Sequence, residues 1–276
     1  PSSPASGYDC AIMSPRPSSE VDRRSGYMKN NQVETGLAID LKAAATALQT
    51  EYGIVAHLIQ QTSDAHSIYT DLATAHDMVC TLPSIIQAAK REAASPNWAS
   101  NCALALLNTA IMLYVRATKT SSRHRRSFDM RSKLDAEQKI VHDKLCALRD
   151  DAIAHFGPGH LRDNLTWQIE GIFIPLDRPD DLKIMTGSRR IFQQQELQDE
   201  FKLQLEQALE IAKAEVNRRN SRLVDSLNSH IGDKRLLAIL HEHRVNLRDF
   251  FEGDTARDEA LGGLRQGIVS GHTEHR

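Results

Sequence analysis

The residues of this chain best suited to chemistry lie close together, between Arg149 and His155. On a helix, the six positions that separate them correspond to about 9 Å along the axis and a difference in direction of about 120°. The two side chains would therefore flank a ligand rather than touch each other. Arginine is permanently charged and pairs with anionic oxygens, whereas histidine transfers protons near neutral pH, so the pair suits a phosphate. Asp150 could orient either side chain.

His155 also has a purely structural interpretation. A helix is predicted from about Leu134 to Ala154, before Gly157-Pro158-Gly159 ends it. His155 continues the apolar stripe of this helix, whose members are Val141, Leu145, Leu148 and Ala152. A core imidazole that is hydrogen-bonded near a helix C-terminus would explain the residue equally well.

The segment Arg149-Asp150-Asp151-Ala152-Ile153-Ala154-His155 resembles the motif of the HEPN superfamily (higher eukaryotes and prokaryotes nucleotide-binding). That motif allows four to six residues between Arg and His, and this chain has five. The resemblance implies an all-α domain that forms a homodimer through the motif helix and cleaves RNA without metal. Arg149 would bind the scissile phosphate, His155 would act as general acid or base, and Asp150 would orient them. Asp150 replaces an Asn that is common in the family, and Asp151 adds a second acid, so basic partners would be needed to prevent repulsion of RNA.

A strongly basic segment precedes the motif. Its 18 residues, from Arg116 to Lys133, hold seven basic side chains and one acid, Asp129. The basic residues are Arg116, Lys119, Arg123, Arg125, Arg126, Arg131 and Lys133. Such a segment is typical of a loop that contacts RNA phosphates, although a solvated loop between helices is the alternative. Because it lies at the far end of a helix about 30 Å long, the segment is not expected to reach His155 of its own chain easily, whereas an antiparallel dimer could bring the two together.

Two functions remain open. The first is a metal-independent endoribonuclease, which would fit a toxin with an antitoxin protein as partner or a phage-defence component. The second is a non-catalytic helical module for interaction or dimerisation. The patterns GxGxxG, GxxxxGK[ST], HExxH and GxSxG are absent from the sequence. His241 and His243 would point about 160° apart on a helix, so neither a metal site nor a cofactor is expected.

The elements that must position these residues are predicted to be helices. The fold class is expected to be all-α, an up-and-down helical bundle with a small inserted β-hairpin at about 164–187, where β-branched and aromatic residues gather. The helical domain spans 36–252, between a disordered arm at 1–35 and a flexible tail at 253–276. Pro83 is expected to end or kink its helix. The apolar stripes comprise Leu37, Leu41, Ala44, Leu48 and Tyr52; Ile68, Leu72, Ala75, Val79 and Leu82; Leu104, Leu107, Ile111 and Tyr114; and Phe201, Leu205, Leu209, Ala212 and Val216.

Composition sets broad limits on the chain. Its 34 basic and 36 acidic residues nearly cancel, so any nucleic-acid site must be a local patch such as 116–133. No run approaches the roughly 20 uninterrupted apolar residues of a membrane span, and the first residues do not resemble a secretion signal. The four cysteines have neither metal-ligand nor disulfide-framework spacing. A cytoplasmic protein with reduced, buried thiols is therefore expected.

Overall fold

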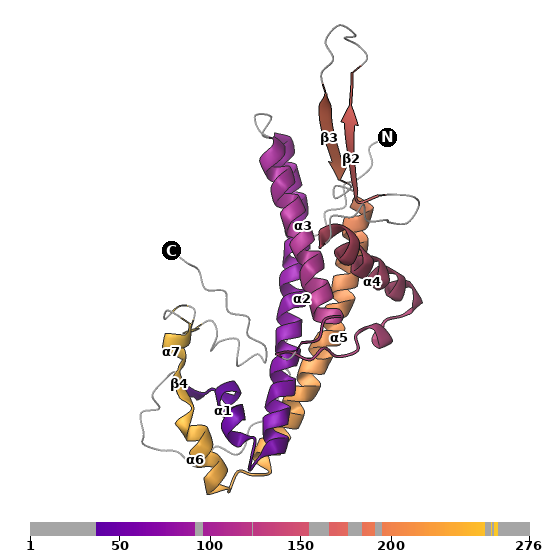
Figure 1. The fold of residues 1–276 in the computed structure, drawn as a ribbon. Coiled ribbons are helices and arrows are strands. Elements are labelled where there is room, and N and C mark those ends of the chain that lie inside the picture. Colours follow the sequence, from indigo (N-terminus) through magenta and orange to yellow (C-terminus); the bar gives the residue numbers. More distant parts are fainter. Residues whose placement is uncertain are drawn as a thin grey trace, which may run out of the picture. The chain divides into compact units, whose positions relative to one another are not determined.

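The computed structural model describes residues 37–91, 96–122, 124–154, 166–175, 184–190 and 195–251, together with 255, 257 and 258. Contacts within the chain divide it into two units, 1–35 and 36–276, and every described residue belongs to the second. The predicted arm at 1–35 and most of the predicted tail at 253–276 therefore lie outside the described residues. The described part is mostly helical, as the sequence predicts (Figure 1).

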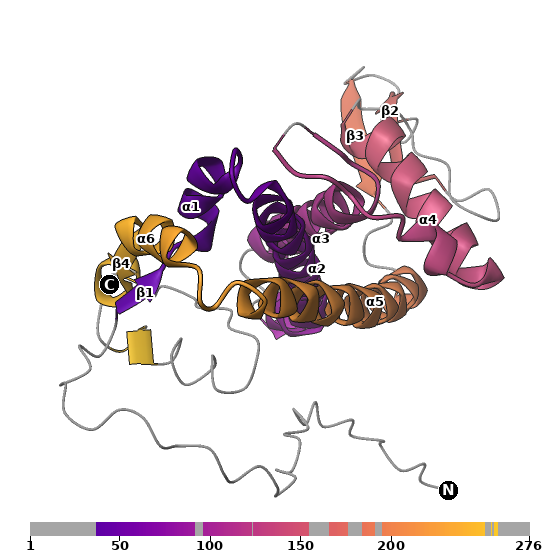
Figure 2. The ribbon, with the colours of Figure 1, turned by 90° about the horizontal axis from the view of Figure 1, so that it is seen from below.

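Three long helices form the main hydrophobic core: α2 (Gly53–Arg91), α3 (Pro96–Thr118) and α5 (Gln195–Asn228). Helix α2 packs against both of the others (Figures 1 and 2). Most members of the predicted stripes are buried in this contact: Ile68, Leu72, Ala75, Val79, Leu82, Leu104, Leu107, Ile111, Tyr114, Phe201, Leu205 and Ala212. Helix α2 continues through Pro83 to Arg91, so the helix does not end at this proline.

A second, smaller core cluster joins the two ends of the described chain. It contains α1 (Leu41–Leu48), α6 (Lys234–Glu242) and the adjoining ends of α2 and α5. Both short helices begin at aspartate N-caps, since Asp40 accepts a hydrogen bond from the Ala43 amide and Asp233 accepts from those of Arg235 and Leu236.

The first predicted helical stripe begins too early. Leu37 belongs to strand β1 (Leu37–Ile39), which pairs antiparallel with β4 (Arg244–Asn246), directly before the short helix α7 (Leu247–Phe250). The hydrogen-bond partner of β1 is β4, near the far end of the described chain, so the local sequence around Leu37 does not predict the strand.

The inserted β-hairpin is present. Strand β2 (Gln168–Phe173) pairs antiparallel with β3 (Met185–Arg190), with Ile172 opposite Thr186 and Phe173 opposite Met185. The pairing ends three residues beyond the predicted limit at 187. Trp167, directly before β2, is buried in the main core and anchors the base of the hairpin.

One helical stretch in the described part, Trp98–Thr118 of α3, is long and apolar enough by composition to cross a membrane. Its apolar side chains at Leu104, Leu107 and Ile111 are buried in the main core. Of the whole stretch, 39% is buried within the described structure.

Candidate functional site

The predicted motif helix consists of an α-helix and a π-helical turn. Helix α4 (Ala136–Leu148) begins at a capping box on Asp135. At its end the backbone widens into η2 (Arg149–Ile153), where the Ala154 amide donates to the Arg149 carbonyl at 2.9 Å, five residues back along the chain. Turns of this kind are rare and frequently mark functional sites. The wider turn contains the first five of the seven residues of the Arg–His motif.

The Arg149 guanidinium is held by two neighbours but not fully covered. Its Nη1 donates to Asp150 Oδ1 at 2.6 Å, and its Nη2 donates to Thr120 Oγ1 at 3.4 Å. The Nε atom is buried and has no hydrogen-bond partner. Because 26% of the side chain remains exposed, the guanidinium can still be reached by a ligand from solvent.

Lys119 completes this cluster. Its ammonium donates to Asp150 Oδ2 at 2.8 Å, and this hydrogen bond raises the pKa of Lys119. Asp150 thus accepts hydrogen bonds from both Arg149 and Lys119, so this acid has the basic partners that it would need to avoid repelling RNA. We call Arg149, Asp150, Lys119 and Thr120 the η2 cluster.

The η2 cluster corrects one expectation about the basic segment. Lys119 and Thr120 were expected to lie a helix length away from the motif of their own chain. They instead contact it, because the C-terminal end of α3 packs against η2. A second chain is not needed to bring this part of the segment to Arg149.

The first half of the basic segment is bound by an aspartate on α2. Asp71 accepts from Arg116 at 2.6 and 2.9 Å and from Arg125 at 2.5 Å. Arg125 also donates to Ser67 and to the Arg116 carbonyl, and only 14% of its side chain is exposed. These contacts fasten the segment to α2, so Arg125 has a structural role.

The second half is bound by acids of α4 and α5. Arg131 forms a bidentate ion pair with Asp143, at 2.8 and 2.9 Å, and Lys133 lies 3.7 Å from Glu215. Glu215 also accepts from Arg218 and Arg219, whose hydrogen bonds lower its pKa to about 2. Five of the seven basic side chains of the segment therefore lie in ion pairs, but they share four acids, of which Asp150 and Glu215 also bind other arginines.

Three predicted site residues are not part of these contacts. His155 and Arg123 lie outside the described residues, so the separation of Arg149 and His155 is not defined. The Arg126 side chain is exposed, while its backbone amide donates to Asp64 at 3.2 Å. Of the proposed catalytic trio, the structure brings together Arg149 and Asp150.

A buried polar network beside the η2 cluster has no counterpart in the sequence predictions. Gln204 Nε2 donates to the Tyr114 hydroxyl at 2.8 Å, and this hydroxyl lies 2.9 Å from His142 Nδ1. The other ring nitrogen of His142 lies 3.6 Å from Cys146 Sγ. The direction of the bond between this hydroxyl and His142 depends on the tautomer of the imidazole, because a hydroxyl can both donate and accept. Burial lowers the pKa of His142 and raises that of Cys146 to about 11.

The thiols differ from one another in exposure. Cys146 is buried, Cys80 is half-buried and Cys102 is exposed, which corrects the expectation of buried thiols. Cys10 lies outside the described residues. Among the described residues, no group of three or more His, Cys, Asp or Glu side chains is arranged to hold a metal ion.

A groove of about 660 Å³ runs between α4 and α5. Ile140 and Leu203 project into it from the two helices and are 48% and 65% exposed, while Glu137 and Glu200 add negative charge. This groove does not include Arg149 or Lys119, so it is separate from the η2 cluster.

Comparison with known proteins places the chain in no known group. No protein-family model matches it, and no curated protein and no solved structure is significantly similar to it.

Proposed function

We propose that this chain is a cytoplasmic HEPN-like endoribonuclease, with an up-and-down bundle of helices, that cleaves RNA without a metal ion at the η2 cluster. The observation that carries the proposal is the meeting of Arg149 and Lys119 on the Asp150 carboxylate in the π-helical turn, with Thr120 accepting a hydrogen bond from Arg149. Such a protein would serve as a toxin with an antitoxin partner, or in phage defence.

The cluster has the chemical groups that a phosphate needs. A phosphodiester is an anion with two free oxygens, so it can replace the Asp150 carboxylate between Arg149 and Lys119. The exchange is feasible because Lys119 is 52% exposed and Asp150 is 38% exposed, and ion pairs open to water are weak. Thr120 adds a hydroxyl that can hydrogen-bond to the same ligand.

In the proposed reaction His155 accepts the proton of the RNA 2′-hydroxyl. The 2′-oxygen then attacks phosphorus, and the bond from phosphorus to the 5′-oxygen breaks. The products are a 2′,3′-cyclic phosphate and a 5′-hydroxyl, whose proton comes from water. Arg149 would stabilise the negative charge that builds on the phosphate oxygens.

Exposed cations of the basic segment would hold the RNA backbone. Arg116, Arg131 and Lys133 are each about half exposed, at 56%, 54% and 46%, even though they are paired with acids. A homodimer through the motif helix would bring two such surfaces together.

The test is RNA cleavage in EDTA by the full chain, compared with Arg149→Ala and His155→Ala. Arg235→Ala is the control, because it also removes an arginine that is ion-paired with a carboxylate, in an exposed contact with Glu51 at the start of α6. We expect both motif variants to lose at least 100-fold in rate and the control to cleave as the wild type does. Absence of cleavage by the wild type, or equal cleavage by His155→Ala, contradicts the proposal.

A non-catalytic interaction module is the second candidate. The observation that favours it is that five of the seven cations of the basic segment already form ion pairs, with Asp71, Asp143, Asp150 and Glu215. In this case Arg149→Ala lowers the free energy of unfolding, and the wild type neither binds nor cleaves RNA.

A further inference from the structure

One face of α2 binds a row of arginines from other segments. The contacts are made at four positions of α2, spaced three or four residues apart, and such positions lie on the same face of a helix. These positions are Gln61, Asp64, Ser67 and Asp71. At 1.5 Å per residue the row of contacts is about 15 Å long.

Cations from three segments gather along this face, and we call them the α2 basic surface. They are Arg116 of α3, Arg125, Arg126 and Lys133 of the segment that follows α3, and Arg218 and Arg219 of α5. Arg219 donates to the Gln61 carbonyl at 2.6 Å, and the Arg126 backbone amide donates to Asp64 at 3.2 Å. Helices α2 and α5 and the segment after α3 therefore meet at this surface.

The acids of this surface lie beneath its cations. Asp64, Asp71 and Glu215 are only 3%, 8% and 5% exposed. In contrast, the side chains of Arg116 and Arg218, which pair with two of these acids, are 56% and 53% exposed. The acids therefore hold the guanidinium groups from within, and the positive charges face the solvent.

Cations also outnumber acids here. Three of the cations, Lys133 and the two of α5, share Glu215, and two others share Asp71. Even when Asp64 and the neighbouring Asp129 are counted, six cations face four acids. These ten residues have a formal charge of +2, in a chain whose net charge is −2.

Several donors of the α2 basic surface remain open to a ligand. Arg116 and Arg218 each bind their acid through Nε and Nη2. Within the described residues the Nη1 atoms of these two arginines form no hydrogen bond, and the exposed Arg126 side chain forms none either. Guanidinium groups oriented in this way suit the anionic oxygens of a phosphate.

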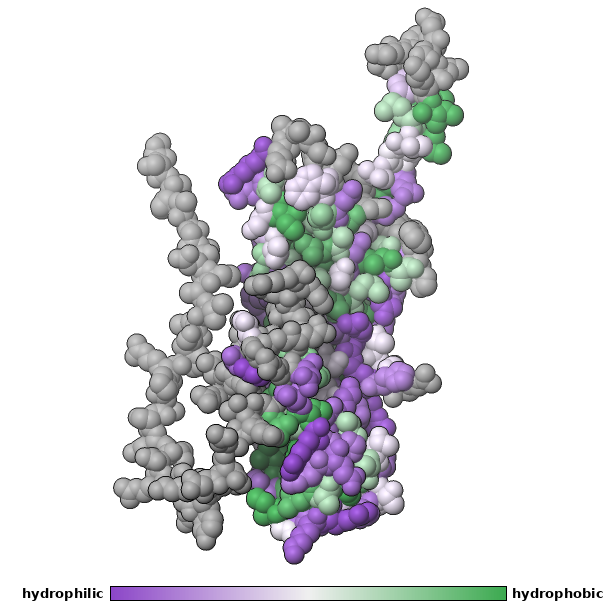
Figure 3. Space-filling model, turned by 90° about the vertical axis from the view of Figure 1, so that its left-hand side faces the viewer, coloured by the Kyte–Doolittle hydropathy of each residue, from purple (hydrophilic) through white to green (hydrophobic). Residues whose placement is uncertain are grey.

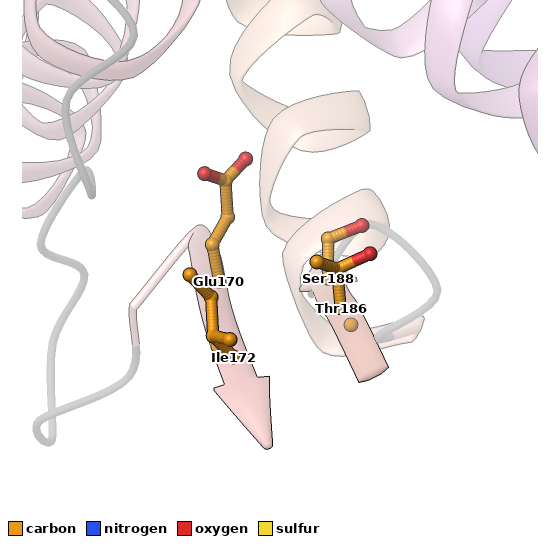
Figure 4. Close-up of a pocket in the computed structure, with 6 residues that line it drawn as sticks. Glu170, Ile172, Thr186 and Ser188 are labelled. Atoms are coloured by element: carbon orange, nitrogen blue, oxygen red, sulfur yellow. The ribbon is translucent and has the colours of Figure 1, made fainter. Parts of the chain in front are cut away.

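The β2–β3 hairpin differs from this surface in its chemistry. Figure 3 shows apolar surface on the hairpin, and Figure 4 shows its open depression, with Glu170 and Ile172 from β2 and Thr186 and Ser188 from β3. Glu170 is the one ionisable side chain among the residues that line the depression. A polyanion would therefore bind at the α2 basic surface rather than in this depression.

The length of the surface favours a nucleic-acid strand over an acidic protein. A strand advances about 3.4 Å per nucleotide, so about four phosphates fit along the row of contacts on α2. Phosphates recur regularly along a strand, as the contacts recur at each turn of α2, whereas the carboxylates of a protein surface have no fixed repeat. Five of the six cations are arginines, which bind phosphate through paired hydrogen bonds.

We infer that the α2 basic surface binds the phosphate backbone of RNA outside the η2 cluster. Arg116 lies three positions before Lys119, so the surface begins beside that cluster, and a strand bound along α2 is held next to Arg149. Arg218 and Arg219 of α5 belong to this surface although they lie outside the basic segment at 116–133. The choice of RNA as the ligand rests on the proposed function, but the inference does not require cleavage.

The test is the binding of a fluorescein-labelled, single-stranded 2′-O-methyl RNA to the full chain, followed by fluorescence anisotropy at several salt concentrations. This probe cannot be cleaved, because its 2′-oxygens are blocked. The variants are Arg126→Ala, Arg218→Ala and the combination of both. They should fold, because the Arg126 side chain is exposed and Glu215 keeps its ion pairs with Lys133 and Arg219.

Arg235→Ala is the matched control for Arg218→Ala. Arg235 binds Glu51 through Nε and Nη2, as Arg218 binds Glu215, and its side chain is 65% exposed. It lies on α6, in the smaller core cluster rather than at the α2 basic surface. Circular dichroism should give the same helix content for the control and the variants.

We expect the control to bind as the wild type does and the double variant to bind about 10-fold more weakly. Each phosphate contact adds about 0.7 to the salt dependence of binding to a single strand, so the double variant should lower that slope by about 1.4. Equal affinity and slope in the double variant and the control, or a wild type that does not bind the probe, would overturn the inference. Tighter binding of polyglutamate than of RNA would overturn it as well, in favour of an acidic protein.

Cleavage of unmodified RNA separates this inference from the proposed function. Binding that depends on Arg126 and Arg218, without cleavage by the wild type, supports the α2 basic surface and contradicts the ribonuclease. Cleavage that depends on Arg149, with binding that is unchanged in the double variant, supports the ribonuclease and contradicts the inference.

Discussion

Lys119, the first residue after α3, donates a 2.8 Å hydrogen bond to Asp150 in the π-helical turn, 31 positions later in the chain. This contact joins the basic segment to the Arg–His motif within a single chain. It also leaves Arg149 with a carboxylate that any phosphate ligand must displace. We therefore expect Asp150→Asn to strengthen binding of a short, uncleavable RNA, by about threefold to tenfold, because a neutral amide no longer competes for the cations. Fluorescence anisotropy measures the change, and weaker binding by the variant would contradict it.

Asp71 is expected to be the most important acid for stability. It is 8% exposed and is shared by Arg116 and Arg125, so Asp71→Ala leaves two guanidinium groups without their carboxylate. We expect a loss of about 3 kcal/mol in the free energy of unfolding, measured with urea. The control is Asp143→Ala, which breaks only the half-exposed pair with Arg131 and should cost less than about 1 kcal/mol.

Tyr114→Phe tests the buried polar network. The hydroxyl is bonded to Gln204 and His142, and both of these side chains are buried. Its removal leaves two polar groups without a partner, which should cost about 2–4 kcal/mol. Tyr69→Phe on α2 is the control, since its hydroxyl forms no hydrogen bond within the described residues, and it should change stability by less than about 0.5 kcal/mol.

His142 should make the fold sensitive to mild acid. Burial lowers its pKa in the folded state below the ordinary value of 6.5, so the unfolded state binds the proton more readily. Its contribution to stability is complete above pH 6.5 and declines as the pH falls toward the folded pKa, by up to about 1.4 kcal/mol per pH unit. Thermal melts from pH 8 to pH 5 measure this slope. It should become shallower in His142→Gln, and an unchanged slope would contradict the assignment.

Thiol reactivity should follow burial. Cys102 is exposed, whereas Cys146 is buried and its pKa is raised to about 11, so almost none of it is thiolate at pH 8. With iodoacetamide on the folded chain, mass spectrometry should find Cys102 modified and Cys146 at least 100-fold slower. In urea the two rates should become similar, and fast modification of Cys146 in the folded chain would contradict its position in the core.

Two glycines of the β2–β3 hairpin, Gly171 and Gly187, can be used to test where the Phe173 ring lies. A Cβ on Gly171 would overlap the Phe173 ring, whereas a Cβ on Gly187 would lie 3.3 Å from the nearest ring atom. We therefore expect Gly171→Ala to displace the ring and speed amide exchange in β2, and Gly187→Ala to have a smaller effect. Global stability should change by less than about 0.5 kcal/mol in both, because the ring lies outside the core. Equal exchange in the two variants would show that the ring does not lie over Gly171.

The sequence by itself determined the helices and the side chains that they bury. Leu72, Val79, Leu107 and Phe201 were assigned to buried faces from a periodicity of 3.6 residues, and all four are in the core. This was possible because the apolar face of a helix depends on neighbours three or four positions away.

Which charged side chains form ion pairs was decided only by the tertiary structure. Asp71 and Arg125 are 54 positions apart, and their ion pair exists because α2 packs beside the segment that follows α3. The β1–β4 pair is a second example, since strands of three residues obtain their hydrogen bonds from a distant segment. The sequence could therefore locate the seven basic residues but could not show that four of them pair with acids of α2, α4 and α5. That depends on how the helices pack, because electrostatic pairing acts between neighbours in space, whatever their separation along the chain.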